Sequence, residues 1–307
     1  MSDTNVSLSR KIGSAGDLQS VVRTMKAMAA SSIGQYGNSV RAVGEYYQTI
    51  ELGLGACFRA HPPPPAGSER KAITSTAAVV FGSDQGLVGQ FNDVVADFAI
   101  QNLASMPGKP MLWAVGERVD ARLIEAGLTL AGVFPVPNSV RAITPLVGQI
   151  LVEHESHHGR SEVTELHLFY NRPGISPVYA PVQQRLLPLD EEWCRQLAQR
   201  PWPTQLPPEV MGTGTETLRA LIREYLFVSI FRACAESLAS ENASRLSAME
   251  RADKNIDELL ENLRGTFHKL RQSAIDEELF DVISGYEALS KFLLPVAKEI
   301  PRVSLFA

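Results

Sequence analysis

The sequence predicts two long terminal helices that pair as an antiparallel coiled coil, with an α/β domain between them. Three observations lead to this α+α/β fold: the distribution of the prolines, the heptad spacing of apolar residues near both ends, and alternating strand and helix patterns in the middle. Of the 19 prolines, all but Pro295 and Pro301 lie between Pro62 and Pro208. Since a proline inside a helix costs about 3 kcal/mol or more, the longest helices are expected near the two ends.

Apolar residues near both ends recur every three or four positions, which is the spacing of a coiled-coil strand. The N-terminal positions expected to face the partner helix are Leu8, Ile12, Ala15, Leu18, Val22, Met25, Ala29, Ser32 and Tyr36. The C-terminal ones are Met249, Ala252, Ile256, Leu259, Leu263, Phe267, Leu270 and Ala274. A C-terminal helix of roughly 80 residues would be about 120 Å long, which predicts a rod with the shorter N-terminal helix paired against it.

Residues 61–70, HPPPPAGSER, form a stiff polyproline linker that marks the start of a separate domain. We therefore divide the chain into an N-terminal helix (1–60), a linker (61–72), an α/β domain (73–208), a C-terminal helix (209–296) and a tail (297–307). Strands are expected at Ser75–Phe81, Met111–Val115, Leu128–Phe134 and Glu162–Tyr170, with an edge strand at Val178–Leu187. Helices are expected at Phe91–Leu103, Glu117–Ala126 and Val140–Glu155, and an irregular connection at Leu189–Thr215. This alternation favours a parallel sheet covered by helices.

Composition excludes several classes of protein. No run approaches the roughly 18 consecutive apolar residues of a membrane span, and the first residues, MSDTNVSLSRK, lack the apolar core of a signal peptide. Cys57, Cys194 and Cys234 are isolated thiols without CxxC spacing, so we expect buried structural cysteines in a reducing compartment. The net charge of −5 weighs against a dedicated nucleic-acid binder.

The loop GSDQGLVGQFN, Gly82–Asn92, follows a strand and precedes a helix, where α/β proteins bind phosphate. It contains neither GxGxxG nor the GK[ST] ending of a phosphate-binding loop, so nucleotide binding is an alternative that we do not favour. The favoured interpretation is a tight turn. In that turn, Gly86 and Gly89 adopt unusual dihedral angles and Asp84 or Asn92 caps the following helix.

Other polar clusters have simple interpretations. The segment EHESHHG could be a metal site, but its three histidines, His154, His157 and His158, lie at a predicted helix end where they are expected to be solvated. No catalytic constellation is present. A set of polar residues on the C-terminal helix is expected to form a solvated face: Glu236, Ser237, Ser240, Glu241, Arg245, Asn255, Arg271, Gln272 and Glu278.

Three separated segments resemble a known family. Glu236–Leu289 carries ASE, R-x-x-AM, A-x-x-N, RQ and I-x-x-E-L elements in order, SDQGLVGQFN is similar to the loop SDRGLCGGFN, and Ile12–Ala30 resembles IxSVxNTQKITKAMxMVAA. These are the patterns of the γ subunit, or central stalk, of F-type ATP synthases. The resemblance implies an antiparallel coiled coil with a Rossmann-like domain that binds no nucleotide and needs no cofactor or metal.

The resemblance also implies partners. In the family the coiled coil enters the hexamer of α and β subunits, while the central domain and the foot of the stalk bind the ε subunit and the ring of c subunits. The chain would then be a non-catalytic rotor that couples ion transport to ATP synthesis or hydrolysis at the cytoplasmic face of the plasma membrane. Residues that match β-subunit contacts are Met25, Glu241, Arg245, Arg271, Gln272, Asp276 and Glu278, where Asp276 replaces the usual threonine.

Two interpretations other than a rotor stay open at this point: a soluble nucleotide-binding enzyme that uses the Gly82–Asn92 loop, and a coiled-coil scaffold. The chain also continues past Leu289 with SKFLLPVAKEIPRVSLFA, further than is usual in the family. Pro295 is expected to end or kink the helix. The apolar residues of this extension suggest an apolar bearing, and deleting residues 295–307 should then reduce coupling or complex stability.

Overall fold

The computed structural model describes residues 4–60, 76–106, 108–158, 165–175, 178–206, 208–209 and 213–296. The linker 61–72 and the tail 297–307 therefore lie outside the described residues. The chain divides into two compact units: Met1–Thr24 with Arg251–Ala307, and Met25–Glu250. The two terminal helices contribute to both units. None of the described helices contains a stretch long and apolar enough to cross a membrane.

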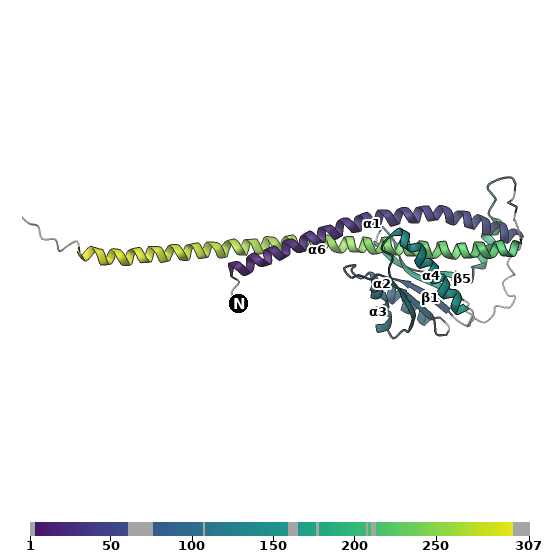
Figure 1. The fold of residues 1–307 in the computed structure, drawn as a ribbon, viewed down its shortest axis with the longest axis horizontal. Coiled ribbons are helices and arrows are strands. Elements are labelled where there is room, and N and C mark those ends of the chain that lie inside the picture. Colours follow the sequence, from purple (N-terminus) through teal and green to yellow (C-terminus); the bar gives the residue numbers. More distant parts are fainter. Residues whose placement is uncertain are drawn as a thin grey trace, which may run out of the picture. The chain divides into compact units, whose positions relative to one another are not determined.

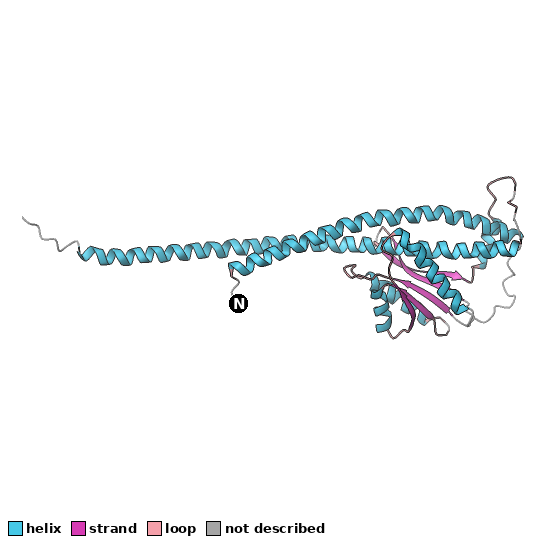
Figure 2. Cartoon of the chain, viewed as in Figure 1, coloured by secondary structure: helices cyan, strands magenta, loops and turns pink. Residues whose placement is uncertain are grey.

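The two proline-poor ends form the long helices α1, Asn5–Ala60, and α6, Gly214–Val296 (Figures 1 and 2). At 1.5 Å per residue, the 83 residues of α6 extend about 125 Å. The last residue of α6 is one position past Pro295. The prediction of two long terminal helices that pack together is confirmed.

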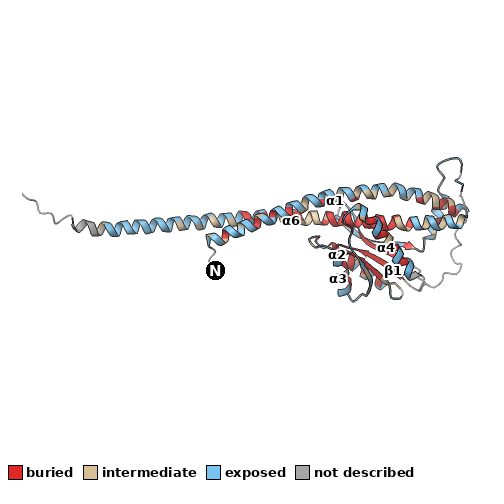
Figure 3. Cartoon of the chain, in the orientation of Figure 1, coloured by how far each residue is buried: buried red, intermediate tan, exposed pale blue. Residues whose placement is uncertain are grey.

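In the first unit, α1 and α6 pack antiparallel along a narrow row of residues, which we call the seam. Buried side chains recur along both helices (Figure 3). They are three, four or seven residues apart on α1 and four residues apart on α6. They are Leu8, Ala15, Gln19, Val22, Ile256 and Leu260. The expected seam positions Leu18 and Leu259 are instead 54% and 49% exposed, because the true repeat follows a strict heptad and carries them out of the interface.

A polar cluster replaces apolar packing where Leu18 was expected to lie. Gln19 Nε2 donates to Asp253 Oδ1 at 3.2 Å and to Asp257 Oδ1 at 2.5 Å, and Arg23 Nε donates to Asp253 Oδ1 at 3.1 Å. Gln19 is 9% exposed, so its amide would be costly to bury without these acceptors. The seam of this unit is therefore part apolar and part hydrogen-bonded.

The second unit contains a five-stranded sheet in the order β3-β2-β1-β4-β5. Its strands are β1 Thr76–Phe81, β2 Met111–Val115, β3 Leu130–Phe134, β4 Glu165–Pro173 and β5 Tyr179–Leu187. The first four pair parallel, whereas β5 runs antiparallel to β4 at the edge. All six residues of β1 are buried, as expected for a strand covered on both faces.

Helices cover both faces of this sheet (Figure 1). On one face, α2 (Phe91–Ala104) and α3 (Glu117–Glu125) pack on Ala78 and Val80 of β1. On the other face, α4 (Val140–His158) and the Ile230–Ala239 stretch of α6 pack on the alternate β1 side chains. Helix α6 is therefore a layer of the α/β domain as well as a partner of α1. In this unit too the helix pair is antiparallel, because Tyr36 lies near Glu241 while Tyr46 bonds Glu224.

The connection expected to be irregular contains a helix, α5, Glu191–Gln199. Asp190 caps it by accepting a hydrogen bond from the Glu192 backbone N–H, and its apolar side packs with the C-terminal end of α1 and the start of α6. Prolines at 188 and 201 flank this short helix, which is why the stretch resembled a loop in the sequence. The prediction of an irregular connection was wrong for these residues.

Candidate functional site

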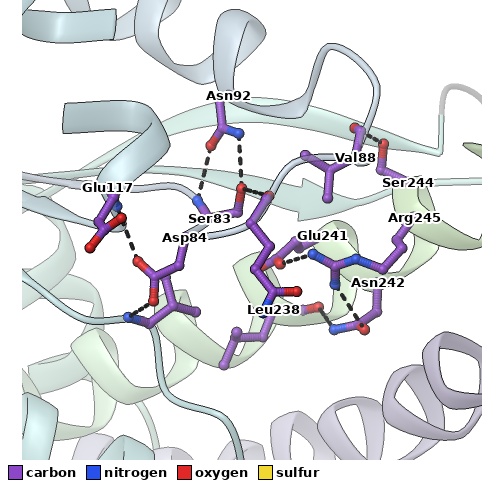
Figure 4. Close-up of polar contacts among 12 residues, drawn as sticks. Ser83, Asp84, Val88, Asn92, Glu117, Leu238, Glu241, Asn242, Ser244 and Arg245 are labelled. Carbon is purple, nitrogen blue, oxygen red and sulfur yellow. Dashed lines mark hydrogen bonds and ion pairs between the residues drawn. The ribbon is translucent and has the colours of Figure 1, made fainter. Parts of the chain in front are cut away.

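The Gly82–Asn92 loop connects β1 to α2 and is closed by its own side chains (Figure 4). The backbone N–H of Ser83 donates to Asn92 Oδ1 at 2.9 Å, and Asn92 Nδ2 donates to Ser83 Oγ at 2.9 Å. Ser83 Oγ donates in turn to the Gln85 carbonyl at 2.9 Å. Both Ser83 and Asn92 are buried. Asn92 thus closes the loop and does not cap α2, whose N-cap residue is Gln90, without a side-chain hydrogen bond.

Asp84 caps a helix, but a different one from that expected. Its Oδ1 accepts from the N–H of Glu117, the first residue of α3, at 3.0 Å, and its Oδ2 accepts from the N–H of Val136 at 2.9 Å. A carboxylate at the positive end of a helix is stabilised by the helix dipole. Because both oxygens hold backbone groups, Asp84 fixes the loop against α3 and the segment that follows β3.

The loop contains one strained residue. Gly89 has a φ of 58°, as predicted, but the second positive φ belongs to Leu87, at 63°, and not to Gly86. A left-handed conformation costs an L-residue about 1 to 2 kcal/mol, and the Leu87 side chain is 63% exposed. Packing among the described residues therefore does not account for the strained conformation of this exposed leucine.

Replacing Leu87 by glycine is therefore expected to raise the free energy of unfolding by about 0.5 to 1 kcal/mol. Glycine relieves the backbone strain at this position, and this relief exceeds the entropy cost of a glycine. Little apolar burial is lost, because the leucine side chain is exposed. Urea unfolding followed by tryptophan fluorescence measures it. Gly89→Ala is the matched control, expected to lose about 1 kcal/mol at its φ of 58°. A less stable Leu87→Gly variant would show that the leucine side chain packs usefully.

A hollow of about 330 Å³ lies between the loop and α3. Its charged lining side chains include Arg122, which bonds Asp93 at 2.8 Å and Glu125 at 2.7 Å. The carboxylates compensate this guanidinium, so the hollow offers little net attraction for a polyphosphate. The geometry gives the nucleotide alternative no support.

The segment of α6 that faces the loop is buried and polar. Glu236, Ser237, Ser240, Glu241, Asn242 and Ser244 are each at most 8% exposed. The prediction of a solvated face was wrong here, because the α/β domain covers this side of the helix. It holds further along α6, where Asn255, Arg271, Gln272 and Glu278 are exposed. One signal was present in the sequence: four serines within eleven residues, 237–247, favour contacts with backbone carbonyls over solubility.

Glu241 and Arg245 form a pair inside this buried segment (Figure 4). Arg245 Nη2 donates to Glu241 Oε1 at 2.6 Å, and the two side chains are 14% and 7% exposed. Burial raises the pKa of Glu241; Arg245 lowers it and the Asp84 carboxylate raises it further. Glu241 Oε2 has no hydrogen-bond partner among the described residues. The pair is therefore a desolvated ion pair directed inward.

The other predicted site residues lie elsewhere. Met25 is half-buried on α1. Arg271, Gln272, Asp276 and Glu278 are exposed on α6 in the first unit. The structure thus brings Glu241 and Arg245 to the Gly82–Asn92 loop. Met25 belongs to the same unit. The four residues beyond position 270 lie on a solvent-exposed stretch of α6.

The histidines and cysteines have structural surroundings. His154 is 5% exposed within α4, so the expectation that it is solvated was wrong. No group of three or more His, Cys, Asp or Glu side chains placed to hold a metal occurs among the described residues. All three cysteines are buried, as predicted, and burial raises the pKa of the Cys194 thiol to about 11.

Comparison with known proteins places this architecture in a family. Residues 5–289 match the sequence model of the family described as ATP synthase. The chain belongs to the ATP synthase gamma chain family. Relatives include the ATP synthase gamma chains of Moorella thermoacetica, 25% identical over 92% of this chain and 98% of that one, and of Anaeromyxobacter sp., 27% identical over 91% and 97%.

Solved structures support the fold of this gamma chain. It is similar to a chain in the structure of the Euglena gracilis mitochondrial ATP synthase OSCP/F1/c-ring, with a TM-score of 0.61, 16% identity, and coverage of 97% of this chain and 98% of that one. A chain in the central stalk/c-ring structure of the Tetrahymena thermophila enzyme gives a TM-score of 0.54 at 20% identity, covering 76% and 99%. As a gamma chain, the protein is the central-stalk rotor subunit and is not itself catalytic.

Proposed function

We propose that this gamma chain transmits rotation between a membrane ring of c subunits and a hexamer of α and β subunits, and that the end of α6 meets the hexamer. The observation that carries the proposal is the exposed apolar surface of α6 beyond Arg271. Its large exposed apolar side chains are Ile275, Leu279, Phe280, Val282, Ile283, Tyr286 and Leu289. An apolar surface of this extent is typical of a protein interface.

The charge of the same stretch specifies the partner surface. Five acidic residues and no lysine or arginine occur from Gln272 to Ser290. A complementary surface would be apolar with basic groups around it. Arg271 stands at the border of this acidic stretch, beside Gln272, and both are exposed. We propose Arg271, Gln272, Asp276 and Glu278 as contacts with β subunits.

Glu241 and Arg245 take part in a different way in this proposal. Their side chains bond each other and are buried in the isolated chain. Arg245 would reach a β subunit only along its partly exposed edge, with Glu241 holding the guanidinium in one orientation. Met25, half-buried on α1, completes the proposed set of contacts.

The α/β domain is proposed as the side that meets the ε subunit and the c-ring. The Euglena gracilis and Tetrahymena thermophila structures that this chain resembles are described as containing a c-ring. The chain would then be held at the cytoplasmic face of the plasma membrane through the complex, as a peripheral subunit without a cofactor.

The test is co-expression of this chain with the α and β subunits of its own complex, followed by size-exclusion chromatography and an ATPase assay. One chain is expected to join each hexamer and to raise turnover. Arg271→Ala/Gln272→Ala is expected to weaken binding roughly tenfold, because it removes two contacts worth about 1.4 kcal/mol together.

A matched control is available on α5. Arg195 and Gln196 are the same two residue types, adjacent and exposed, in the other unit. Arg195→Ala/Gln196→Ala should leave assembly and turnover unchanged. If the chain elutes separately from the hexamer and does not change its ATPase turnover, the scaffold interpretation is supported. Tight ATP binding by the isolated chain would support the enzyme interpretation.

A further inference from the structure

Three polar residues on one side of α6 hold the α/β domain. Glu236 Oε2 accepts from Arg172 Nε at 3.0 Å, Ser240 Oγ donates to the Asn171 carbonyl at 2.9 Å, and Ser244 Oγ donates to the Val88 carbonyl at 2.5 Å. We call these three residues the polar stripe. They are 4%, 0% and 8% exposed, so both serine contacts are made away from water. The Glu236 contact is partly exposed, because the Arg172 side chain is 48% exposed.

The spacing of the polar stripe matches the helix. Its members are four residues apart, so they lie along one face at intervals of about 6 Å. They contact two different parts of the domain: the end of β4, through Asn171 and Arg172, and the Gly82–Asn92 loop, through Val88. A single helix face therefore holds two separate segments.

The two segments are also joined to each other. Asn171 Nδ2 donates to the Phe91 carbonyl at 2.9 Å, and Ser83 and Asn92 close the loop between them. Arg232 Nε bonds the second oxygen of Glu236 at 2.7 Å, which fixes that carboxylate on α6. The loop, the end of β4 and α6 form a closed hydrogen-bonded network.

The polar stripe continues past the end of the apolar contact between α6 and the sheet. Among the described residues, the α6 side chains of the apolar cluster on that face of the sheet run from Leu226 to Ala239 and no further. Ser240 and Ser244 then bond backbone carbonyls. Apolar packing is non-directional, whereas hydrogen bonds weaken steeply when their geometry is disturbed. Past Ala239, rotation of α6 against the domain would break directional bonds.

We propose that the polar stripe locks the α/β domain to α6 so that domain and helix turn as one body under load. The proposal rests on the proposed rotor function and adds the residues through which torque passes between helix and domain. Ser240 and Ser244 are positioning residues here, because they act by holding the Asn171 and Val88 backbone and not by contacting another subunit.

The variant Ser240→Ala/Ser244→Ala tests the proposal, with Ser244→Ala alone as a milder form. The first measurement is hydrogen exchange of the isolated full chain. Each lost bond should raise the population of the detached loop about fivefold, so amides of residues 82–92 should exchange faster. Ser237→Ala is the matched control: Ser237 is 3% exposed on the same helix and its Oγ has no hydrogen-bond partner among the described residues.

The second measurement separates a structural effect from torque transfer. A bead is attached through Gln101→Cys, exposed on α2, and driven by ATP hydrolysis in the assembled hexamer; the native cysteines are buried and do not take the label. The double variant should show wider angular fluctuation of the bead at each pause as viscous load increases, because the domain is held less stiffly to α6, while Ser237→Ala should not. If both variants keep the wild-type fluctuation and exchange rates, the polar stripe is not the lock. A wild-type chain that fails to drive the bead contradicts the rotor function instead.

Discussion

Replacing Glu241 by alanine is expected to lower the free energy of unfolding by about 3 to 5 kcal/mol, because it leaves Arg245 buried without its partner. The guanidinium and carboxylate are 2.6 Å apart and their side chains are 14% and 7% exposed. Alanine also leaves a void beside the Gly82–Asn92 loop. Urea unfolding at neutral pH, followed by tryptophan fluorescence, measures the loss.

The control is the double variant Glu241→Met/Arg245→Met, which removes both charges and keeps most of the volume. The burial that raises the pKa of Glu241 shows that the surroundings disfavour its charge despite Arg245. The double variant should therefore be as stable as the wild type, or more so. If Glu241→Ala costs less than about 1 kcal/mol, the Arg245 side chain can turn to solvent or to another partner, and the ion pair with Glu241 does not fix its position.

The main elements were predictable because each has a local signal. Long helices form where prolines are absent, and β1 and α2 follow from a buried run, a glycine-containing turn and an amphipathic segment. The antiparallel direction of β5 has no such signal, since a strand pattern is the same in either direction. Helix α5 was missed because a nine-residue helix between prolines resembles a loop.

The seam between α1 and α6 shows the limit of apolar periodicity. The sequence pattern favours Leu18 over Gln19, since leucine is the apolar residue, yet Gln19 is buried and Leu18 exposed. In the heptad repeat formed by Leu8, Ala15 and Val22, position 19 also faces α6. Two carboxylates one turn apart on α6 accept hydrogen bonds from the Gln19 amide, which offsets the cost of burying it. Burial of a polar group depends on partners more than 230 residues away, which no local pattern contains.

The candidate site was predictable by residue type more than by role. Asp84, Gly89 and Asn92 all shape the loop, but Asp84 caps α3 and Asn92 closes the loop on Ser83. Glu241 was expected on a surface and is instead paired and buried. These roles depend on which side of α6 the α/β domain covers, and that is decided by tertiary packing.

Gly116 lies where the loop closely approaches the backbone between β2 and α3. It lies between β2 and α3 with a φ of 115°, and an added Cβ would be 2.8 Å from the N, C and O atoms of Ser83. The Gly116 N–H also donates to the Phe134 carbonyl at 2.9 Å, so the residue cannot move away freely.

Gly116→Ala is therefore expected to cost more than about 4 kcal/mol and to prevent the α/β domain from folding at ordinary temperature. The clash is with backbone and not with a flexible side chain, so the loop itself must move. Moving Ser83 would break its bonds to Asn92 and displace Asp84 from Glu117 and Val136. Circular dichroism and urea unfolding of the full chain measure the effect, while α1 and α6 would keep part of the helical signal.

Gly127→Ala separates the close approach from the dihedral angle. Gly127 has a φ of 82° and nothing within 4 Å of an added Cβ, so alanine there should cost only about 1 to 2 kcal/mol of backbone strain. The difference between the two variants then measures how rigidly the hydrogen-bonded loop is held at Ser83. Equal losses of unfolding free energy would mean that the loop moves at Ser83 at no cost in stability. A loop that moves so easily could not transmit force between α6 and the sheet.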